Sequence, residues 1–201
     1  MRDIKSLCVY CGSSSGSHPV YTEAAQAFGT RLAKEGIALV YGGGKVGLMG
    51  TVADAVLAAG GKVIGVIPRQ LVEKEVAHTG LSELQVVETM HERKTRMYEL
   101  SDAFVALPGG FGTMDEMFEM LTWAQLGLHG YPCAYLDVRG FYRNLAASMD
   151  HMVAEGFVKS SQRDQVWFGE SIDALFDWMF HFESTFTPKW ITPASIDGTV
   201  A

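Results

Sequence analysis

The sequence AFVALPGGFGTMDEM, from Ala103 to Met117, joins an apolar run to a glycine-rich loop and then to a helix-like segment. The apolar run Ala103–Leu107 has no polar interruption, which is typical of a strand buried on both faces of a parallel sheet. Pro108 ends this run. The stretch therefore predicts a strand, a loop and a helix in succession.

The loop after this strand contains three glycines, Gly109, Gly110 and Gly112. The first two permit a turn with positive φ, and the third leaves backbone amides bare. Thr113 is expected to cap the helix that follows. Because free amides at a helix N-terminus attract negative charge, the loop predicts an anion site.

The same alternation of apolar runs and amphipathic segments occurs along the chain, and repeated β-α-β units predict right-handed crossovers. Five further strands are expected at Ile4–Tyr10, Ile37–Tyr41, Lys62–Ile67, Leu84–Val87 and Cys133–Val138, with helices at Val20–Lys34, Gly47–Ala59 and Glu92–Leu100. The pattern predicts an α/β fold with a single Rossmann-like domain over residues 1–183, built on a doubly wound parallel sheet with helices on both faces. Residues 184–201, rich in Thr, Ser and Pro, are expected to form an irregular tail.

The bulk composition narrows the classes of partner. The chain has 201 residues and a formal net charge of −7, so nucleic acid and anionic membrane surfaces would be repelled on average. No apolar run approaches the roughly 20 residues that a membrane helix needs, and the N-terminus lacks the features of a signal peptide. The sequence therefore predicts a cytoplasmic protein without a nucleic-acid or membrane partner.

Cys8 and Cys11 form a C-x-x-C pattern, and Cys133 lies far away in the sequence. A zinc or redox site would need a second Cys or His pair at ligand spacing, which does not follow. Residues three apart in a strand face opposite sides. We therefore interpret all three cysteines as buried free thiols and expect no metal site.

Glycine and hydroxyl residues follow three of the predicted strands. The segments are CGSSSGS at 11–17, YGGGKVG at 41–47 and PGGFGT at 108–113. Ligands of doubly wound sheets lie beyond the carboxyl ends of the strands, so these segments should converge on one rim. Secondary phosphate or ribose contacts are expected from Ser13, Gly43 and Gly44.

Gly42, Gly44 and Gly47 also satisfy the pattern G-x-G-x-x-G between a strand and a helix. A dinucleotide site requires an acidic residue about 20 positions further on, at the end of the next strand. That strand ends in VIGVIPRQ, residues 63–70, which contains no carboxylate. A Walker loop is disfavoured because Val46 stands where its hydroxyl residue would be. The alternative is a tight turn with close packing of helix on sheet.

Glu116 has two interpretations. With Thr113 it matches a capping box, in which its carboxylate would reach back to the start of its own helix. A second constellation, MHERKTRM at 90–97, favours a functional role because it places Arg93 and Lys94 on the same rim. Pairing of Glu92 with Arg96 on a solvated helix face would explain only part of this cluster. Arg93 and Lys94 have no obvious acidic neighbour, and Arg suits phosphate through its planar fork.

PGGFGTMDE together with MHERK resembles the PGGxGTxxE signature of the LOG ("Lonely guy") family of cytokinin riboside 5′-monophosphate phosphoribohydrolases, which are often mislabelled lysine decarboxylases. The similarity extends from CVYCGSSSG through LVYGGGKVGLMG and GVIP to TWAQLG. It implies a modified Rossmann fold, a homodimer or higher homo-oligomer, and hydrolysis of a nucleoside 5′-monophosphate to free base and ribose 5-phosphate without a metal or other cofactor. By motif position it implies the catalytic pair Arg93 and Glu116, and nucleotide contacts from Glu75, Arg93, Lys94, Gly110, Phe111, Gly112, Thr113, Met114, Asp115, Glu116 and Thr122.

The residue chemistry agrees with this resemblance. Cleavage of an N-glycosidic bond builds positive charge on the ribose, which a carboxylate such as Glu116 would stabilise, and near a helix N-terminus the carboxylate form is favoured. The rival interpretation is a non-catalytic nucleotide-binding or sensing module, which would bind the same ligand without releasing ribose 5-phosphate. The apolar stripe of Met114, Met117, Phe118, Leu121 and Trp123 is expected to lie in the core or in a subunit interface.

Overall fold

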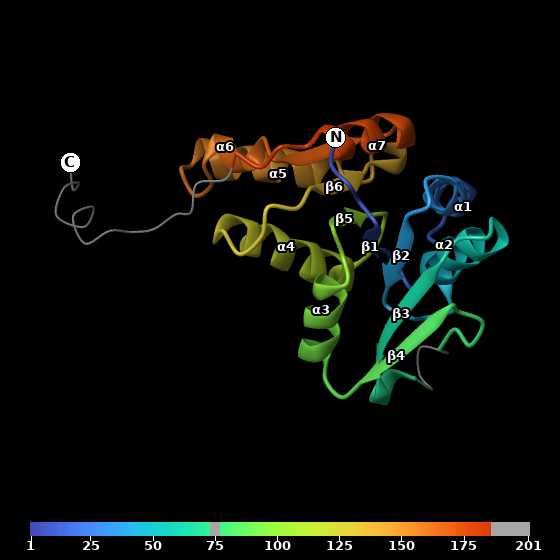
Figure 1. The fold of residues 1–201 in the computed structure, drawn as a ribbon. Helices are drawn as coiled ribbons and strands as arrows, with labels where there is room; N and C mark the ends of the chain where they lie inside the picture. The colour runs from blue at the N-terminus through green and yellow to red at the C-terminus, as the bar shows by residue number, and fades with distance from the viewer. Residues whose placement is uncertain (73–76, 186–201) are drawn as a thin grey trace, which may run out of the picture.

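The computed structural model describes residues 1–72 and 77–185, and within these residues seven strands form one sheet (Figure 1). The strands are β1 (Ser6–Tyr10), β2 (Ala38–Tyr41), β3 (Val63–Pro68), β4 (Glu83–Val87), β5 (Ala103–Ala106), β6 (Cys133–Leu136) and β7 (Val166–Gly169). Their order across the sheet is β4-β3-β2-β1-β5-β6-β7, and every neighbouring pair is parallel. The predicted doubly wound α/β fold is confirmed.

The strand order reverses between β1 and β5, which pair in the register Leu7 with Ala103 to Tyr10 with Ala106. The chain winds outward from β1 to β4 on one side and from β5 to β7 on the other. A crevice opens at such a reversal because the connections leave toward opposite faces of the sheet. The loops that follow β1 and β5 therefore form the expected ligand-binding position.

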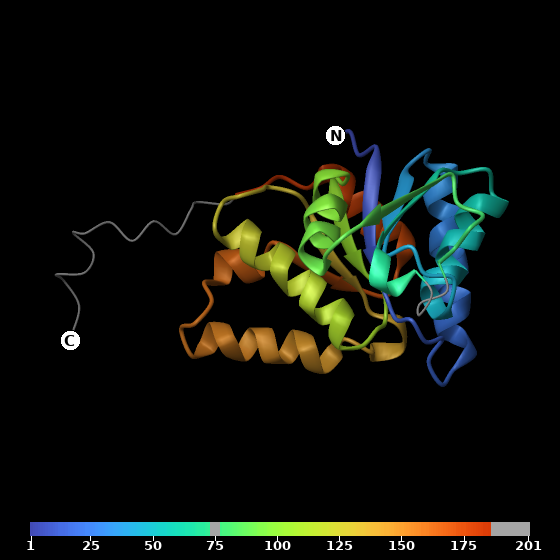
Figure 2. The ribbon, with the colours of Figure 1, turned by 90° about the horizontal axis from the view of Figure 1, so that it is seen from below.

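Helices cover both faces of the sheet (Figures 1 and 2). They are α1 (Pro19–Lys34), α2 (Gly47–Ala58), α3 (Met90–Glu99), α4 (Phe111–Gln125), α5 (Arg143–Ala154), α6 (Ser160–Arg163) and α7 (Ile172–His181), with 3₁₀ turns at Arg69–Leu71 and Val138–Gly140. The core on one face is built with α1, α2 and α7, and the core on the other with α3, α4 and α5. The part of the chain that the structure describes has no helix with both the length and the apolar character needed to cross a bilayer.

All six predicted strands and all three predicted helices are present, the helices to within two residues at each end. Strand β7 was not predicted, because its four residues, VWFG, are only half buried at the edge of the sheet and carry a weak pattern. Of the predicted tail, residues 186–201 lie outside the described part of the chain. Before them, the N–H of Thr185 donates to Oε1 of Gln165 at 3.2 Å.

Alternation along β1 separates the two cores. Leu7 and Val9 face one core, whereas Cys8 and Tyr10 face the other. Cys8 and Cys11 therefore lie on opposite faces as free buried thiols, as predicted. Burial raises the pKa of the Cys133 thiol to about 12, and it raises those of Cys8 and Cys11 further. At neutral pH these side chains are small apolar groups of the core.

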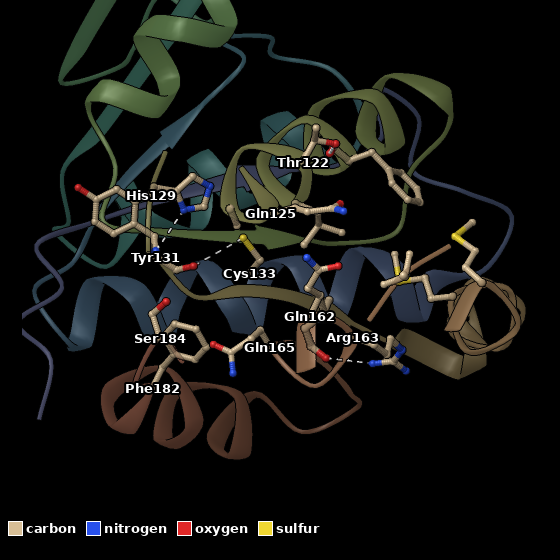
Figure 3. Close-up of a pocket in the computed structure, with 18 residues that line it drawn as sticks. Thr122, Gln125, His129, Tyr131, Cys133, Gln162, Arg163, Gln165, Phe182 and Ser184 are labelled. Carbon is tan, nitrogen blue, oxygen red and sulfur yellow. Dashed lines mark hydrogen bonds between the residues drawn. The ribbon is translucent and has the colours of Figure 1, made fainter. Parts of the chain in front are cut away.

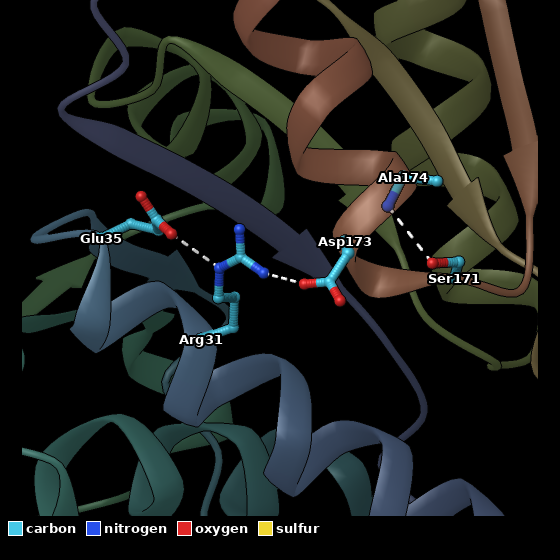
Figure 4. A network of polar contacts seen from close by, with 5 residues as sticks. All are labelled: Arg31, Glu35, Ser171, Asp173 and Ala174. Atoms are coloured by element: carbon cyan, nitrogen blue, oxygen red, sulfur yellow. Dashed lines mark hydrogen bonds and ion pairs between the residues drawn. The ribbon is translucent and has the colours of Figure 1, made fainter.

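Arg31 of α1 contacts residues of α7 (Figure 4). The Arg31 guanidinium donates to Oε1 of Glu35 at 2.7 Å and to Oδ1 of Asp173, and it lies 4.8 Å from the ring centroid of Phe176. The last helix is thereby held on the same face as the first.

The loop between β2 and α2 approaches the loop after β1 closely. Gly47 has φ of +62°, and a Cβ there would lie 2.3 Å from the backbone of Ser13. Gly36 has a similar φ of +70°, but within the described chain a Cβ there would meet nothing within 4 Å. Glycine is thus required twice at Gly47, by conformation and by space.

We expect Gly36→Ala to lower the free energy of unfolding by about 1 to 2 kcal/mol, the cost of left-handed backbone. Gly47→Ala should cost a further 1 to 3 kcal/mol or so, because the new methyl group displaces the loop at Ser13. Urea denaturation followed by circular dichroism measures both. Equal losses in the two variants would contradict the close approach.

Candidate active site

The loops after β1, β2 and β5 meet at the carboxyl edge of the sheet. The N–H of Gly12 donates to the carbonyl of Pro108 at 3.0 Å, and the N–H of Met49 donates to the carbonyl of Gly12 at 3.3 Å. The predicted convergence of three glycine-rich strand ends is therefore confirmed. These two hydrogen bonds between backbone groups join the segments directly.

A pocket of about 280 Å³ opens on this rim, at the reversal of strand order. Its lining consists of Gly12, Ser13, Ser14, Ser15, Gly16, Tyr21, Leu48, Pro108, Gly109, Gly110 and Phe141. Of the predicted contacts, Ser13 and Gly110 lie together here.

Tyr21 and Phe141 were not predicted; their rings meet edge to face with centroids 6.0 Å apart. Nothing in the sequence marks this contact, because it joins α1 to a turn more than a hundred residues away.

Helix α4 begins at Phe111, with Gly110 as its N-cap and, within the described chain, no side-chain capping bond. The predicted cap at Thr113 is wrong, because Thr113 is the third residue of the helix and is buried against Gly109. A Cβ on Gly109 would lie 2.1 Å from Oγ1 of Thr113. Glu116 therefore stands in the second helical turn, too far along for a capping box. The interpretation of Glu116 as a capping residue is excluded, and the favourable effect of the helix N-terminus on it is reduced.

The conformation of the glycine loop also differs from expectation. Gly110 has φ of −97°, and neither it nor Gly109 is among the positive-φ glycines of the described chain. Space rather than backbone twist requires glycine at 109. At Gly110 and Gly112, a Cβ would meet no described atom within 4 Å, and Phe111 between them is 96% exposed. The start of α4 is consequently open to a ligand.

The capping arrangement occurs instead at the start of α3. Oγ1 of Thr89 accepts from the N–H of Glu92 at 3.1 Å, and the Glu92 carboxylate accepts from the N–H of Glu88 at 2.9 Å. The Glu92–Arg96 pairing is wrong, because Arg96 donates to Glu99 at 3.0 Å and to Gln85 at 2.7 Å.

Arg93 is 5% exposed, and its guanidinium points to the end of β2. Its Nη2 donates to the carbonyl of Gly42 at 3.1 Å, and its Nη1 lies 3.8 Å from Sδ of Met90. A Cβ on Gly42 would lie 2.0 Å from that Nη2, so glycine is needed there to admit the arginine. This explains the first glycine of the G-x-G-x-x-G pattern without a dinucleotide.

The charges of Arg93 and Glu116 both reach β1. Burial raises the pKa of the Cys8 thiol, while the charge of Glu116 adds to the rise and that of Arg93 opposes it. Glu116 also adds to the burial effect on the pKa of Cys11 and of Tyr10. Two residues that the sequence separates by more than twenty positions thus act on the same strand.

Lys94 has acidic neighbours, contrary to expectation. Its Nζ lies 3.2 Å from Glu119 and 3.4 Å from Asp115, and its side chain is 16% exposed. Both carboxylates belong to α4, whose residue Met114 is half buried in the adjoining core. Lys94 therefore ties α3 to α4 beside the open helix start.

Other predicted contacts lie apart from the pocket. Gly43 and Gly44 are buried and pair with residues 77 and 78: the N–H of His78 donates to the carbonyl of Gly43 at 2.9 Å, and Gly44 bridges to Ala77. Glu75 lies outside the described residues.

Thr122 lies on a separate apolar groove of about 350 Å³ between α4, α5 and α6 (Figure 3). Its hydroxyl donates to the carbonyl of Phe118 within α4 at 2.7 Å. In Figure 3, Thr122 and Gln125 of α4 lie across the groove from Gln162 and Arg163 of α6. A single chain does not bring Thr122 to the pocket at Ser13.

Within residues 1–72 and 77–185, no group of three or more His, Cys, Asp or Glu side chains is placed to hold a metal ion. The pocket is lined by backbone groups and by the hydroxyls of Ser13, Ser14 and Ser15, and the Arg93 guanidinium lies at the Gly42 carbonyl on the same edge of the sheet. Such groups suit an anionic, hydroxylated ligand.

The fold and this rim define the class of protein: a Rossmann-like α/β protein that receives its ligand where the strand order reverses. The family described as possible lysine decarboxylase matches residues 49–179. A cytokinin riboside 5′-monophosphate phosphoribohydrolase of Arabidopsis thaliana is 47% identical over 159 residues, covering 79% of this chain and 75% of the relative. One of Rhodococcoides fascians is 48% identical over 163 residues, covering 81% and 82%. The chain belongs to this family, the LOG phosphoribohydrolases.

Solved structures support the fold at lower similarity. The molybdenum cofactor binding protein of Rippkaea orientalis superimposes with a TM-score of 0.65 at 22% identity, covering 88% of this chain and 95% of that protein. At that identity the likeness concerns the fold alone.

The strand end that precedes the glycine loop is held by Tyr142, whose hydroxyl donates to the buried carbonyl of Leu107 at 2.6 Å. Tyr135 packs on it with ring centroids 4.8 Å apart, and the Tyr135 hydroxyl is buried without a hydrogen-bond partner among the described residues. We expect Tyr142→Phe to lower the free energy of unfolding by about 1 to 3 kcal/mol, because the buried Leu107 carbonyl would lose this hydrogen bond.

The matched control is Tyr135→Phe, which should change stability by less than about 0.5 kcal/mol or increase it, since it removes an unsatisfied group. Thermal and urea unfolding of both variants give the comparison. A larger loss for Tyr135→Phe than for Tyr142→Phe would refute this account of the strand end.

Proposed function

We propose that this protein hydrolyses the N-glycosidic bond of nucleoside 5′-monophosphates, namely cytokinin riboside 5′-monophosphate and AMP, to free base and ribose 5-phosphate. The observation that carries the proposal is the arrangement at the carboxyl edge of the sheet. There the Gly42 carbonyl fixes the buried Arg93 guanidinium, and α4 begins at the exposed Phe111, with Glu116 in its second turn. The names of the family's curated members support the substrate class.

The phosphate would bind at the start of α4. The first N–H groups of a helix have no partner within the helix, and the helix dipole favours negative charge there. The N–H groups of Phe111, Gly112 and Thr113 occupy these positions, and Gly110 and Gly112 leave space for an anion. Lys94 is paired with Asp115 and Glu119, further along α4, so its charge serves mainly to link α3 to α4.

Hydrolysis would break the bond between C1′ and the base nitrogen, whose electron pair leaves with the base. The ribose becomes oxocarbenium-like, and the Glu116 carboxylate would stabilise this charge and orient the attacking water. Water supplies the hydroxyl at C1′, and the departing base takes up a proton from water. Arg93, fixed by the Gly42 carbonyl, would hold ribose or phosphate oxygens so that C1′ faces Glu116.

Decarboxylation of lysine fits the site less well. A Schiff-base lysine requires a lowered pKa. Burial lowers the pKa of Lys94, but the carboxylates of Glu119 and Asp115 outweigh this effect and raise it overall. The three buried free thiols suit a reducing compartment, and we propose that the protein acts in the cytoplasm.

Glu116→Gln should lower kcat for AMP and for isopentenyladenosine 5′-monophosphate by about 100-fold or more, because the carboxylate charge is lost at the reacting carbon. The Kd for AMP, measured by calorimetry, should change only a few-fold. Chromatography of released base and ribose 5-phosphate measures the turnover.

Glu23→Gln, an exposed change on α1, serves as the control and should retain full activity. Full turnover by folded Glu116→Gln protein would overturn the role of this carboxylate. If the wild-type protein bound AMP and released no base, the chain would be a nucleotide-binding module instead.

We further propose that the groove between α4 and α5 is covered by a second copy of the chain, giving a homodimer. The predicted apolar stripe divides here: Met117 lies in the core, whereas Phe118 and Leu121 line the groove. Leu128 and Phe157, which adjoin the lining residues His129 and Val158 in sequence, are exposed apolar side chains. An apolar surface that continues beyond a groove is typical of subunit interfaces.

Met152→Glu places a charge in this groove and should shift the protein from dimer to monomer in sedimentation velocity, because an unpaired carboxylate would be buried. Val86→Glu, on the edge strand β4, adds the same charge elsewhere and should leave the dimer intact. A monomeric wild-type protein at micromolar concentration would refute the interface.

A further inference from the structure

A buried histidine next to the site takes no part in the chemistry proposed above. His78 is 5% exposed and lies between the 3₁₀ turn at Arg69–Leu71 and β4. Its Nδ1 accepts from the N–H of Gly80 at 3.2 Å, and its Nε2 lies 2.9 Å from Oδ1 of Asp54 on α2. Because Nδ1 is an acceptor, the ring carries its proton on Nε2 and donates it to Asp54.

The backbone of the same residue supports the glycine loop. The N–H of His78 donates to the carbonyl of Gly43 at 2.9 Å, and Ala77 bridges to Gly44. Gly43 has φ of +77°, a conformation that favours glycine, and the three glycines of this loop have no side chains with which to pack. One peptide earlier, the carbonyl of Gly42 accepts from Arg93 at 3.1 Å.

These contacts form a continuous path from α2 through the His78 ring and its peptide to the carbonyl that holds Arg93. We propose that His78 is a positioning residue, which orients Arg93 toward the substrate by fixing the Gly42–Gly44 backbone. The inference rests on the proposed function, in which Arg93 contacts the nucleotide. Asp54 lies on helix α2 and its side chain is 63% exposed. We assign it the role of accepting the hydrogen bond that fixes the orientation of the His78 ring.

The test uses two substitutions of similar size. His78→Leu fills the space without a donor, whereas the amide of His78→Gln can reach Asp54 and donate to it. We expect His78→Leu to lower kcat/KM for AMP by about 10-fold or more, as for other groups that orient a functional side chain. His78→Gln should recover activity to within about 3-fold of wild type. His181→Leu removes an exposed histidine near Asp177 and is the control.

A double-mutant cycle separates positioning from general stability. If His78 acts through Arg93, then His78→Leu should lower kcat/KM by less than about 2-fold in an Arg93→Lys background. Amide exchange at His78 and Gly44 should be faster in His78→Leu than in wild type. Asp54→Ala, which leaves no buried cavity, repeats the test if His78→Leu does not fold.

Additive losses in the cycle, or wild-type activity in folded His78→Leu and Asp54→Ala proteins, would overturn the proposal. If wild-type protein released no base from any monophosphate, the proposed function would fail separately, and the Kd for AMP would replace kcat/KM as the readout. In that case, unchanged AMP affinity in His78→Leu would refute the positioning role.

Discussion

Direct contact between main chains at the carboxyl edge of the sheet is the constraint on which the site depends. The loops after β1, β2 and β5 approach so closely that Gly47 and Gly109 have no room for a Cβ. The peptide of Gly12 is held from both sides, by the carbonyl of Pro108 and by the N–H of Met49. The strand order reverses at the same point. These close backbone contacts therefore border the pocket.

A loop built of glycines has no side chains with which to hold its shape, so its shape depends on neighbours. The Gly42–Gly44 segment receives two such contacts, from the Arg93 guanidinium and from the His78 peptide. The start of α4 is different, because Gly110 and Gly112 face open space. Glycine thus serves close packing in the first loop, whereas the second loop combines the tightly packed Gly109 with two glycines that face open space, although the two loops look alike in sequence.

The site shows where prediction from residues succeeded and where it failed. Arg93 and Glu116 were predicted from a charged cluster that follows β4 and a motif carboxylate that follows β5, and their catalytic roles stay predictions. Thr113 failed as a cap because Gly109 leaves room for its side chain, and α4 begins three residues earlier than that cap would give. Lys94 finds partners on another helix, which no local spacing could reveal. The ring contact of Tyr21 with Phe141 at the pocket also joins distant parts of the chain, so no local pattern predicts it.

The sequence by itself determined the succession of strands and helices, the parallel sheet and the identity of the glycine-rich strand ends, because these depend on short-range periodicity and on residues of unusual conformational freedom. The tertiary structure alone decided which glycine is required for space, which carboxylate pairs with which cation, and that a histidine between β3 and β4 supports the loop that holds Arg93. Such contacts join residues tens of positions apart, and only the packed chain sets the distances between them.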